Sequence, residues 1–178
     1  YATLYRAHYA LIRNPLTNTA GTPTSAIFGF ANQVFQLIDE EKPDYLVAAF
    51  DSKGKNFRHE IFEEYKANRS EMPDEIQTQL PYLWKLLEGM NIPLLRVDGV
   101  EADDIIGTVA KKAEKEGLLT YMVTPDKDFA QLVTDSTFLY KPARFGNGIE
   151  IWGIDEVKNK FEVNTPLQVI DFLGMMGD

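Results

Sequence analysis

Three short apolar runs, each leading into acidic residues, organise this sequence. They are Tyr45–Phe50, which is followed by Asp51, then Ile92–Val97, and then Leu119–Val123. Runs of this length and composition are typical of strands that are buried on both faces of a parallel sheet. A charged side chain survives directly after such a strand only at the exposed carboxyl end. The sequence therefore predicts an α/β protein whose strands end close to acidic side chains.

Segments with helical spacing separate these runs. Apolar residues recur at helical spacing after Thr24 or Ser25, either of which can cap a helix; they are Ile27, Phe30, Val34, Phe35 and Ile38. Further helices are expected over 81–90, 101–115 and 155–161, with Gly117 as a stop after the second of these. Shorter strands are expected at 138–140 and 149–152, on either side of a turn at 145–148.

Strands that alternate with helices predict a three-layer α/β fold, with a mostly parallel central sheet and helices on both faces. Sheets of this kind bind ligands outside the carboxyl ends of their strands. The segment 57–76 does not fit the alternation, because it is polar, mixed in charge and directly follows an acidic strand end. Long polar insertions at such an edge are usually functional loops or lids. A solvated surface helix is the alternative.

Composition limits the choice of function. The 178 residues suit one domain and include no cysteine, which excludes disulfides, thiolate metal sites and a cysteine nucleophile. No apolar run approaches the roughly 20 residues of a membrane helix, and the first residues do not have the pattern expected of a signal peptide. The net charge of −9 argues against nucleic-acid binding only if every acid is free to repel phosphate. The local distribution of the acids therefore matters more than the total.

Acidic residues are concentrated where strands are expected to end. Glu101, Asp103 and Asp104 fall within four residues at the start of an expected helix. The helix dipole stabilises one or two acids there, by roughly 0.3–1 kcal/mol each. A third acid adds mutual repulsion, so that a bound cation becomes the better explanation. Asp51 alone would be weak evidence, because a single Asp in this position often caps a turn.

A second acidic segment follows the run that ends at Val123. Asp126 and Asp128 come directly after it, and either can cap the next helix, while Asp178 supplies a further carboxylate. Each acid taken alone is explained structurally, but three strand ends with acids at one sheet edge indicate a metal centre. Oxygen ligands without Cys or His select Mg²⁺ or Mn²⁺. Two such ions can activate water and stabilise the leaving oxygen in phosphodiester hydrolysis.

Several phrases together resemble a known family. They are Phe50-Asp51, Phe57-Arg58-His59-Glu60, Tyr65-Lys66-Ala67-Asn68-Arg69, Gly99-Val100-Glu101-Ala102-Asp103-Asp104, Thr124-Pro125-Asp126-Lys127-Asp128 and Gly177-Asp178. In this order and at this separation, they resemble the 5′-nuclease domain of bacterial DNA polymerase I, in the flap endonuclease family with a PIN-like fold. The resemblance covers essentially the whole chain. It implies a two-metal hydrolase that removes 5′ flaps and RNA primers from structured DNA.

The resemblance also assigns residues. It implies that Asp51, Glu101, Asp103 and Asp104 surround a first ion, and that Asp126, Asp128 and Asp178 serve a second. It implies that the substrate is contacted by Arg6, Tyr5, Arg58, Tyr65, Lys66 and Arg69. Of these, Arg58, Lys66 and Arg69 are expected to act in catalysis, and Tyr65, Lys66 and Arg69 match a helical arch beside the 5′ strand. For Tyr5, base stacking and core packing are equally good interpretations.

The same resemblance makes expectations about the parent protein. Family members have a strand ending in Asp before the position of Tyr1, and a helix–turn–helix-like DNA-binding element after Asp178. The sequence is therefore expected to be a single nuclease domain, 1–178, truncated at both ends. Expected partners are flap, nicked or primer-bearing DNA and a linked polymerase domain. The protein is expected to be a monomer in the bacterial cytoplasm, associated with the nucleoid and not with a membrane.

Two other classes of protein share some of these sequence features. A haloacid-dehalogenase-like phosphatase also places acids at strand ends with Mg²⁺, but it requires a second Asp two residues after its nucleophile. Lys53 occupies that place after Asp51. A non-catalytic nucleic-acid-binding module is the second alternative. Seven acids argue against it, since repelling carboxylates have no use on a phosphate-binding surface without metal.

Overall fold

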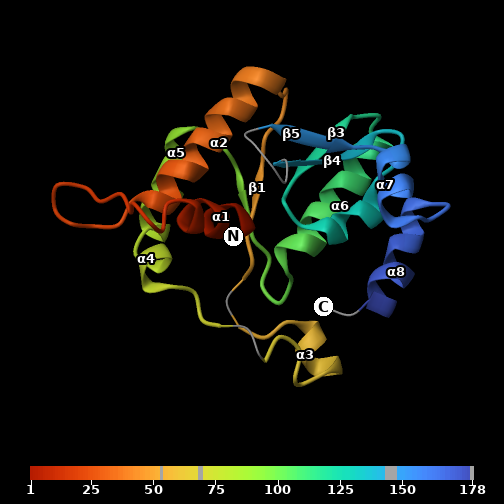
Figure 1. Cartoon of the computed structure of the whole chain (residues 1–178), viewed down its shortest axis with the longest axis horizontal. Coiled ribbons are helices and arrows are strands. Elements are labelled where there is room, and N and C mark those ends of the chain that lie inside the picture. The colour runs from red at the N-terminus through yellow and green to blue at the C-terminus, as the bar shows by residue number, and fades with distance from the viewer. Residues whose placement is uncertain (53, 68–69, 143–147, 177–178) are drawn as a thin grey trace. The chain divides into compact units, whose positions relative to one another are not determined.

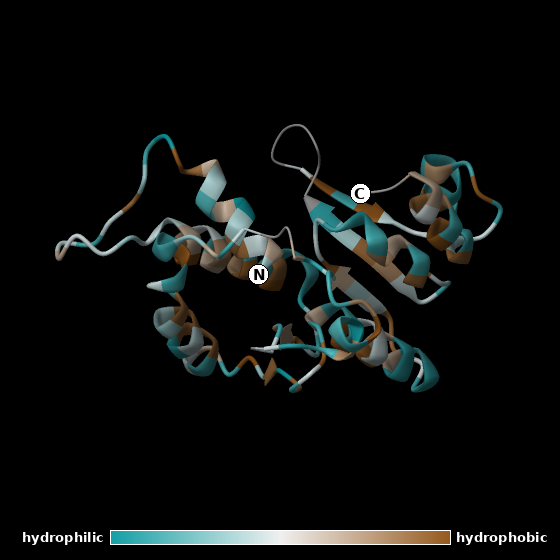
Figure 2. Cartoon of the chain, turned by 90° about the horizontal axis from the view of Figure 1, so that it is seen from below, coloured by the Kyte–Doolittle hydropathy of each residue, from teal (hydrophilic) through white to brown (hydrophobic). Residues whose placement is uncertain are grey.

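The computed structural model describes residues 1–52, 54–67, 70–142 and 148–176, except for the side chain of Pro142. The chain forms two compact units, residues 1–102 and residues from 103 onward, which are described separately below and whose elements are labelled in Figure 1. Figure 2 shows hydrophobic and hydrophilic residues together on the helices of both units, as expected for amphipathic helices. None of the helices in the described part of the chain is long and apolar enough to cross a membrane.

The first unit is built on a pair of parallel strands, β1 (Ala48–Ala49) and β2 (Leu94–Leu95). Its helices are α1 (Ala2–Ala10), α2 (Ser25–Glu41), α3 (Phe57–Ile61), α4 (Asp74–Gln77) and α5 (Leu80–Gly89). The last three form the crossover between the strands, which a parallel pairing requires. Because the strands are parallel, the residues after both of them lie at one edge.

The hydrophobic core of the first unit joins α1, α2, α5 and the strands. Its buried members are Leu4, Ala26, Phe30, Phe50, Ile76, Leu83, Leu87 and Ile92. The expected helix after Thr24 is confirmed as α2, although the Thr24 side chain makes no capping hydrogen bond. Ser25 Oγ instead accepts the backbone N–H of Leu16, at 2.8 Å. Gln79, 1% exposed, accepts the Ile27 N–H at 3.0 Å and thereby ties α5 to α2.

The second unit contains a three-stranded sheet in the order β3 (Thr120–Val123), β4 (Thr137–Pro142), β5 (Ile149–Trp152). It also contains α6 (Ala102–Lys115) apart from its first residue, which belongs to the first unit. Its other helices are the 3₁₀ helices η1 (Lys127–Leu132) and η2 (Pro166–Gln168), and the α-helices α7 (Ile154–Phe161) and α8 (Val169–Met176). Its buried core is separate from that of the first unit, and comprises Ala110, Met122, Phe129, Ala130, Val133, Leu139, Trp152, Val157, Phe161 and Val169.

The observed pairing agrees with the predicted α/β class and refines it. β1–β2 and β3–β4 are parallel, as expected. β5 pairs antiparallel with β4, because the short connection between them cannot make the crossover of a dozen or more residues that a parallel pair needs. The turn expected at 145–148 lies mostly outside the described residues. Among the described strands, the pairs belong to two small sheets, one in each unit, rather than to one continuous sheet.

Candidate functional site

The edge at which β1 and β2 end carries the first expected ligand. Asp51 follows Phe50, and its Oδ1 accepts the backbone N–H of Ala102 at 2.9 Å. Ala102 is the first residue of α6, whose N-terminal N–H groups have no partner within the helix. Ser52 supports the same loop, because its Oγ accepts the N–H of Gly99 at 3.1 Å. The residues after β1 are thereby fixed to the segment 99–102 of the same unit.

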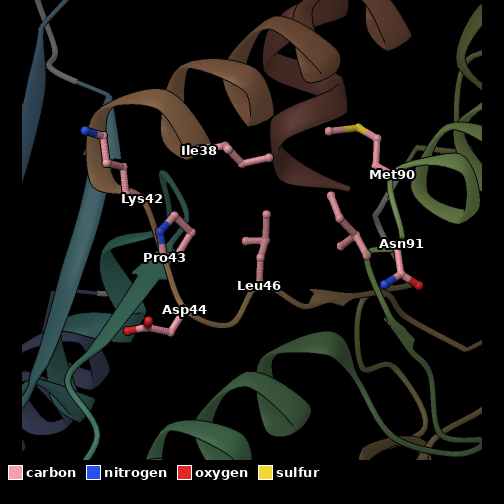
Figure 3. Close-up of a pocket in the computed structure, with 8 residues that line it drawn as sticks. Ile38, Lys42, Pro43, Asp44, Leu46, Met90 and Asn91 are labelled. Atoms are coloured by element: carbon pink, nitrogen blue, oxygen red, sulfur yellow. The ribbon is translucent and has the colours of Figure 1, made fainter.

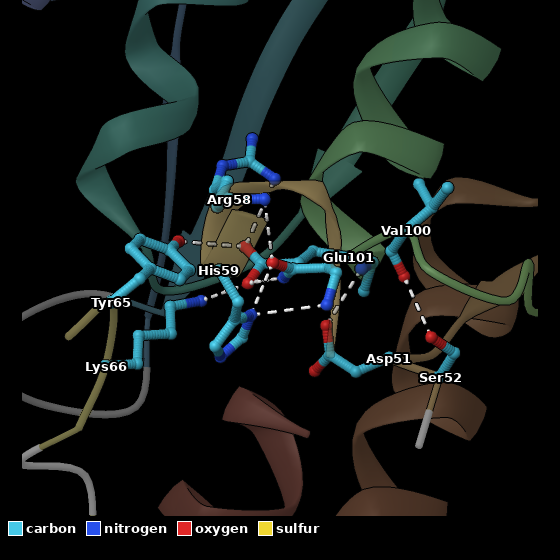
Figure 4. Close-up of polar contacts among 10 residues, drawn as sticks. Asp51, Ser52, Arg58, His59, Tyr65, Lys66, Val100 and Glu101 are labelled. Atoms are coloured by element: carbon cyan, nitrogen blue, oxygen red, sulfur yellow. Dashed lines mark hydrogen bonds and ion pairs between the residues drawn. The ribbon is translucent and has the colours of Figure 1, made fainter. Parts of the chain in front are cut away.

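Glu101 lies at this edge and is almost fully buried, with 7% of its surface exposed. Its Oε1 accepts from Asn56 Nδ2 at 2.6 Å and from Lys66 Nζ at 2.8 Å. Its Oε2 accepts from the Tyr65 hydroxyl at 3.2 Å and lies 3.7 Å from Arg58 Nη1. Figure 4 shows the side chains of Arg58, Tyr65 and Lys66 around the carboxylate of Glu101. One acid thus gathers three of the residues predicted to act on the substrate.

The surroundings of Glu101 favour its ionised form. Burial acts to raise the pKa of its carboxyl group, but the hydrogen bond and positive charge of Lys66, with smaller contributions from Arg58 and Asn56, lower the pKa below its usual value. Charge-assisted hydrogen bonds of this kind are stronger than neutral ones. A buried carboxylate without such partners would instead become neutral. The cluster therefore holds a fixed negative charge beside two cations.

A small polar cavity of about 170 Å³ opens at this cluster; it is lined by Asp51, Ser52, Gly54, Asn56, His59, Lys66, Val100 and Glu101. A larger cavity of about 430 Å³ (Figure 3) is lined by Ile38, Lys42, Pro43, Asp44, Leu46, Met90, Asn91 and Ile92. The larger one lies beside residues that precede β1 and β2, whereas the smaller one lies beside residues that follow them. Of these two cavities, only the smaller one is lined by residues that were predicted to belong to the site.

The predicted ligands of the second unit have local roles in the structure. Asp103 and Asp104 lie in the first turn of α6. Asp126 is the N-cap of η1, and its Oδ1 accepts the backbone N–H of Asp128 at 3.0 Å. Asp128 is exposed in the first turn of η1. The sequence predicts that either Asp126 or Asp128 caps this helix, and the structure shows that Asp126 does so.

The type of side chain at the cavity is the feature that suggests a metal ion, because the predicted ligands are not gathered into a complete binding site. Asp51 and Glu101 border one cavity and offer only carboxylate oxygens, which suit hard cations such as Mg²⁺ or Mn²⁺. Within each unit, no group of three or more His, Asp or Glu side chains gathers closely enough to hold an ion, as far as residues are described. Asp178, a predicted ligand, and Arg69, a predicted substrate contact, lie outside the described residues.

The remaining predicted contacts lie on α1. Arg6 is exposed, whereas Tyr5 is half-buried and packs against the core of the first unit, with its ring 6.4 Å from that of Tyr9. Core packing is thus at least part of the role of Tyr5. Asn56 and His59 were not singled out as site residues from the sequence, although both line the cavity. An Asn directly before a helical segment is a recognised capping signal and could have drawn attention to Asn56.

The fold belongs to a known structural class. The T5 D15 protein, co-crystallised with metal ions, matches 99% of this chain and 64% of its own length, with a TM-score of 0.74 and 19% identity. At this level of identity the match defines the fold alone. The predicted α/β class is confirmed, and it is the PIN-like fold of 5′ nucleases.

Sequence relatives define the family. The 5′-3′ exonuclease N-terminal resolvase-like domain model matches residues 1–162. DNA polymerase I of Bacillus subtilis is 40% identical over 174 residues, which are 98% of this chain and 19% of the relative. The 5′-3′ exonuclease of Aquifex aeolicus is 37% identical over 175 residues, 98% of this chain and 58% of the relative. The chain therefore belongs to the 5′-3′ exonuclease N-terminal domain family, and spans less than two thirds of these relatives.

Proposed function

We propose that this chain is the catalytic part of a metal-dependent 5′ nuclease, which hydrolyses phosphodiester bonds near the 5′ ends of flaps, nicks and primers in DNA. The observation that carries the proposal is the cluster around Glu101. There the buried carboxylate of Glu101 lines one small cavity together with Asp51 and Lys66, and Arg58 Nη1 lies 3.7 Å from Glu101 Oε2. Carboxylates suit a divalent ion and the cations suit a phosphate, so both reactants of a phosphodiesterase find partners at this edge.

We propose that Asp51, Glu101, Asp103 and Asp104 bind a first Mg²⁺ or Mn²⁺ ion, and that Asp126, Asp128 and Asp178 bind a second. Ions of this kind, when bound, make water a nucleophile and neutralise charge on the leaving oxygen. The support is the oxygen-only donor set and the metal-bound T5 D15 relative in fold. The capping bonds of Asp51 and Asp126 fix the position of one oxygen in each side chain.

The basic residues are proposed to act on the substrate. A guanidinium such as that of Arg58 binds phosphate oxygens bidentately, and the ammonium of Lys66 stabilises negative charge that develops on the phosphate under attack. Tyr65 offers its ring to a base, a contact worth about 1–3 kcal/mol in single-strand binders. Arg6 and Arg69 are proposed to contact phosphates, and Tyr5 a base at the junction.

The context of the parent protein is part of the proposal. Because relatives of this chain include DNA polymerase I, we propose that both units act as one nuclease domain linked to a polymerase. Flap and primer removal during replication and repair follows from this arrangement. We further propose that the protein is a monomer in the bacterial cytoplasm and is associated with the nucleoid.

Cleavage of a 5′-flap DNA by the full-length parent protein in Mg²⁺ tests the metal assignment. Asp103→Ala and Asp126→Ala are each expected to lower the rate by about a hundredfold, as loss of a main electrostatic stabiliser does. Asp135→Ala is the matched control, since Asp135 is exposed and lies outside the motifs. Undiminished cleavage by both variants would overturn the assignment. Flap binding without any cleavage by the wild type would favour a binding module instead.

Crystals of the full-length protein soaked in Mn²⁺ give a second test, which does not depend on turnover. Anomalous density is expected beside the carboxylates of Asp103 and Asp126. Density confined to other surface acids would contradict the proposed ligands.

A further inference from the structure

Asn56 is an uncharged polar residue with a central place in the Glu101 cluster. It precedes α3 and is 8% exposed. Its Nδ2 donates to Glu101 Oε1 at 2.6 Å, while its Oδ1 accepts the backbone N–H of Arg58 at 3.1 Å. A carboxylate oxygen can only accept, so the amide has one orientation, with Nδ2 toward Glu101 and Oδ1 toward α3.

Asn56 also holds the ring of His59. The Nδ1 of His59 accepts the backbone N–H of Asn56 at 3.2 Å, which is part of the capping box of α3, and it lies 2.7 Å from Asn56 Oδ1. Both contacts involve the same edge of the ring, so Asn56 fixes the position of that edge.

The ring of His59 continues the chain of contacts back to Glu101. It meets the ring of Tyr65 edge to face, with centroids 5.4 Å apart and planes at 89°. The Tyr65 hydroxyl donates to Glu101 Oε2 at 3.2 Å. The contacts form a closed circuit, Glu101–Asn56–His59–Tyr65–Glu101. Figure 4 shows His59 and Tyr65 beside Glu101.

The residue that follows Tyr65 needs such support. Lys66 has a φ of +58°, in the left-handed region that non-glycine residues rarely adopt. A backbone in this region costs free energy and persists only when its surroundings determine it. In this conformation Lys66 Nζ reaches Glu101 Oε1 at 2.8 Å.

We propose that Asn56 and His59 are positioning residues that hold the Tyr65–Lys66 turn against Glu101, so that the lysine faces the reacting phosphate. The inference deepens the proposed function and rests on it. Neither residue needs to touch the substrate for this role. Asn56 acts through Glu101 and α3, and His59 acts through Asn56 and the ring of Tyr65.

Site-resolved proteolysis tests the positioning without any metal or DNA. In the full-length protein in EDTA, trypsin cleavage after Lys66 is compared by mass spectrometry with cleavage after Lys85, which lies in α5 of the same unit. Asn56→Asp keeps the size of the side chain, but removes the donor to Glu101 and adds a repelling carboxylate. We expect the Lys66 to Lys85 cleavage ratio to rise about tenfold, the size of effect of losing a hydrogen bond to a charged group.

Two further variants make the result interpretable. Asn32→Asp adds the same charge at an exposed position of α2 and is expected to leave the ratio unchanged. His59→Phe keeps a ring against Tyr65 but loses the bond to Asn56, and is expected to raise the ratio less than Asn56→Asp. If Asn56→Asp fails to fold by circular dichroism, His59→Phe decides alone. A ratio equal to that of Asn32→Asp in the variants that fold overturns the proposal.

Kinetics on flap DNA separate this inference from the proposed function. At saturating Mg²⁺, Asn56→Asp is expected to lower kcat about tenfold or more with little change in KM, because the turn is misplaced while the outer DNA contacts remain. An unchanged kcat overturns the role in catalysis. If the wild type cuts no flap with any divalent ion, the proposed function fails, whereas the proteolysis ratio still decides whether Asn56 positions the turn.

Discussion

Glu101 illustrates what a motif can and cannot predict for a single residue. The acidic phrase and the family resemblance singled out Glu101, Arg58, Tyr65 and Lys66, and the structure brings these four side chains together. Asn56 was not predicted, although its Nδ2 donates a hydrogen bond of 2.6 Å to Glu101 Oε1. The residues are 45 positions apart, so that their contact depends on the path of the whole crossover. Local spacing contains no information on such a path.

The contacts of Glu101 predict how the first unit responds to acid. Its folded-state pKa is lowered from the ordinary value of 4.5. It therefore contributes stability that is fully present above about pH 4.5 and is lost as the pH falls through the folded pKa. In EDTA, the free energy of unfolding should fall less between about pH 6 and about pH 3 for Glu101→Gln than for the wild type.

Urea unfolding at a series of pH values measures this difference. Glu88→Gln on α5 is the control, since Glu88 is exposed, and its pH dependence should follow that of the wild type. Identical slopes for wild type and Glu101→Gln would show that the cluster does not stabilise the carboxylate.

At the scale of elements, the strands β3 and β5 were predicted to within one residue, whereas the helix α1 was not predicted. The apolar spacing that predicted α2 and α6 persists over several turns, and the observed bounds differ by only a few residues from those expected. The strands β1 and β2 are two residues each, much shorter than the apolar runs that contain them. An apolar run indicates that its residues are buried. The length of a strand also depends on whether another strand lies beside it to form backbone hydrogen bonds. In its described part, the polar segment 57–76 contains the helix α3, a turn at 63–67 and the beginning of α4.

The packing of α1 on α2 depends on one glycine that no pattern marked. A Cβ at Gly29 would lie 2.6 Å from the Cβ of Ala7, so the helices would have to separate. Overpacking costs about 1–3 kcal/mol, which exceeds the gain of about 1 kcal/mol in helix propensity. We expect Gly29→Ala to lower the free energy of unfolding by about 1 kcal/mol. Chemical denaturation measures the change.

Two companion variants complete this experiment. Gly89→Ala is the control, because a Cβ there meets nothing within 4 Å, and it should be neutral or stabilising. Ala7→Gly combined with Gly29→Ala should recover part of the packing loss, which appears as coupling in a double-mutant cycle. A Gly29→Ala protein more stable than the wild type would contradict the close approach of the helices.

At the scale of the whole molecule, two separate cores predict unequal unfolding of the two units. The chain has two tryptophans. Trp84 packs against the core of the first unit, and Trp152 belongs to the core of the second. Single-tryptophan variants, Trp84→Phe and Trp152→Phe, therefore leave one fluorescent reporter for each unit. Leu139→Ala, at a fully buried site of the second unit, should lower the urea midpoint reported by Trp152 more than that reported by Trp84.

The converse substitution is the matched control. Leu83 is as fully buried in the first unit, and Leu83→Ala should lower chiefly the midpoint reported by Trp84. Each change should cost about 2–5 kcal/mol in its own unit. Equal shifts of both midpoints by either change would mean that the units unfold as one cooperative body.

The bond between Asp51 and the start of α6 affects how loss-of-function data should be interpreted. Asp51 Oδ1 accepts the N–H of Ala102 and so closes a helix end. Replacement of Asp51 by alanine removes the negative charge of the carboxylate and, at the same time, the oxygen that accepts the hydrogen bond from Ala102. An inactive alanine variant is therefore ambiguous between a missing metal ligand and a frayed helix. Asparagine retains a side-chain oxygen for Ala102 without the charge, so the asparagine variant reports on the charge alone.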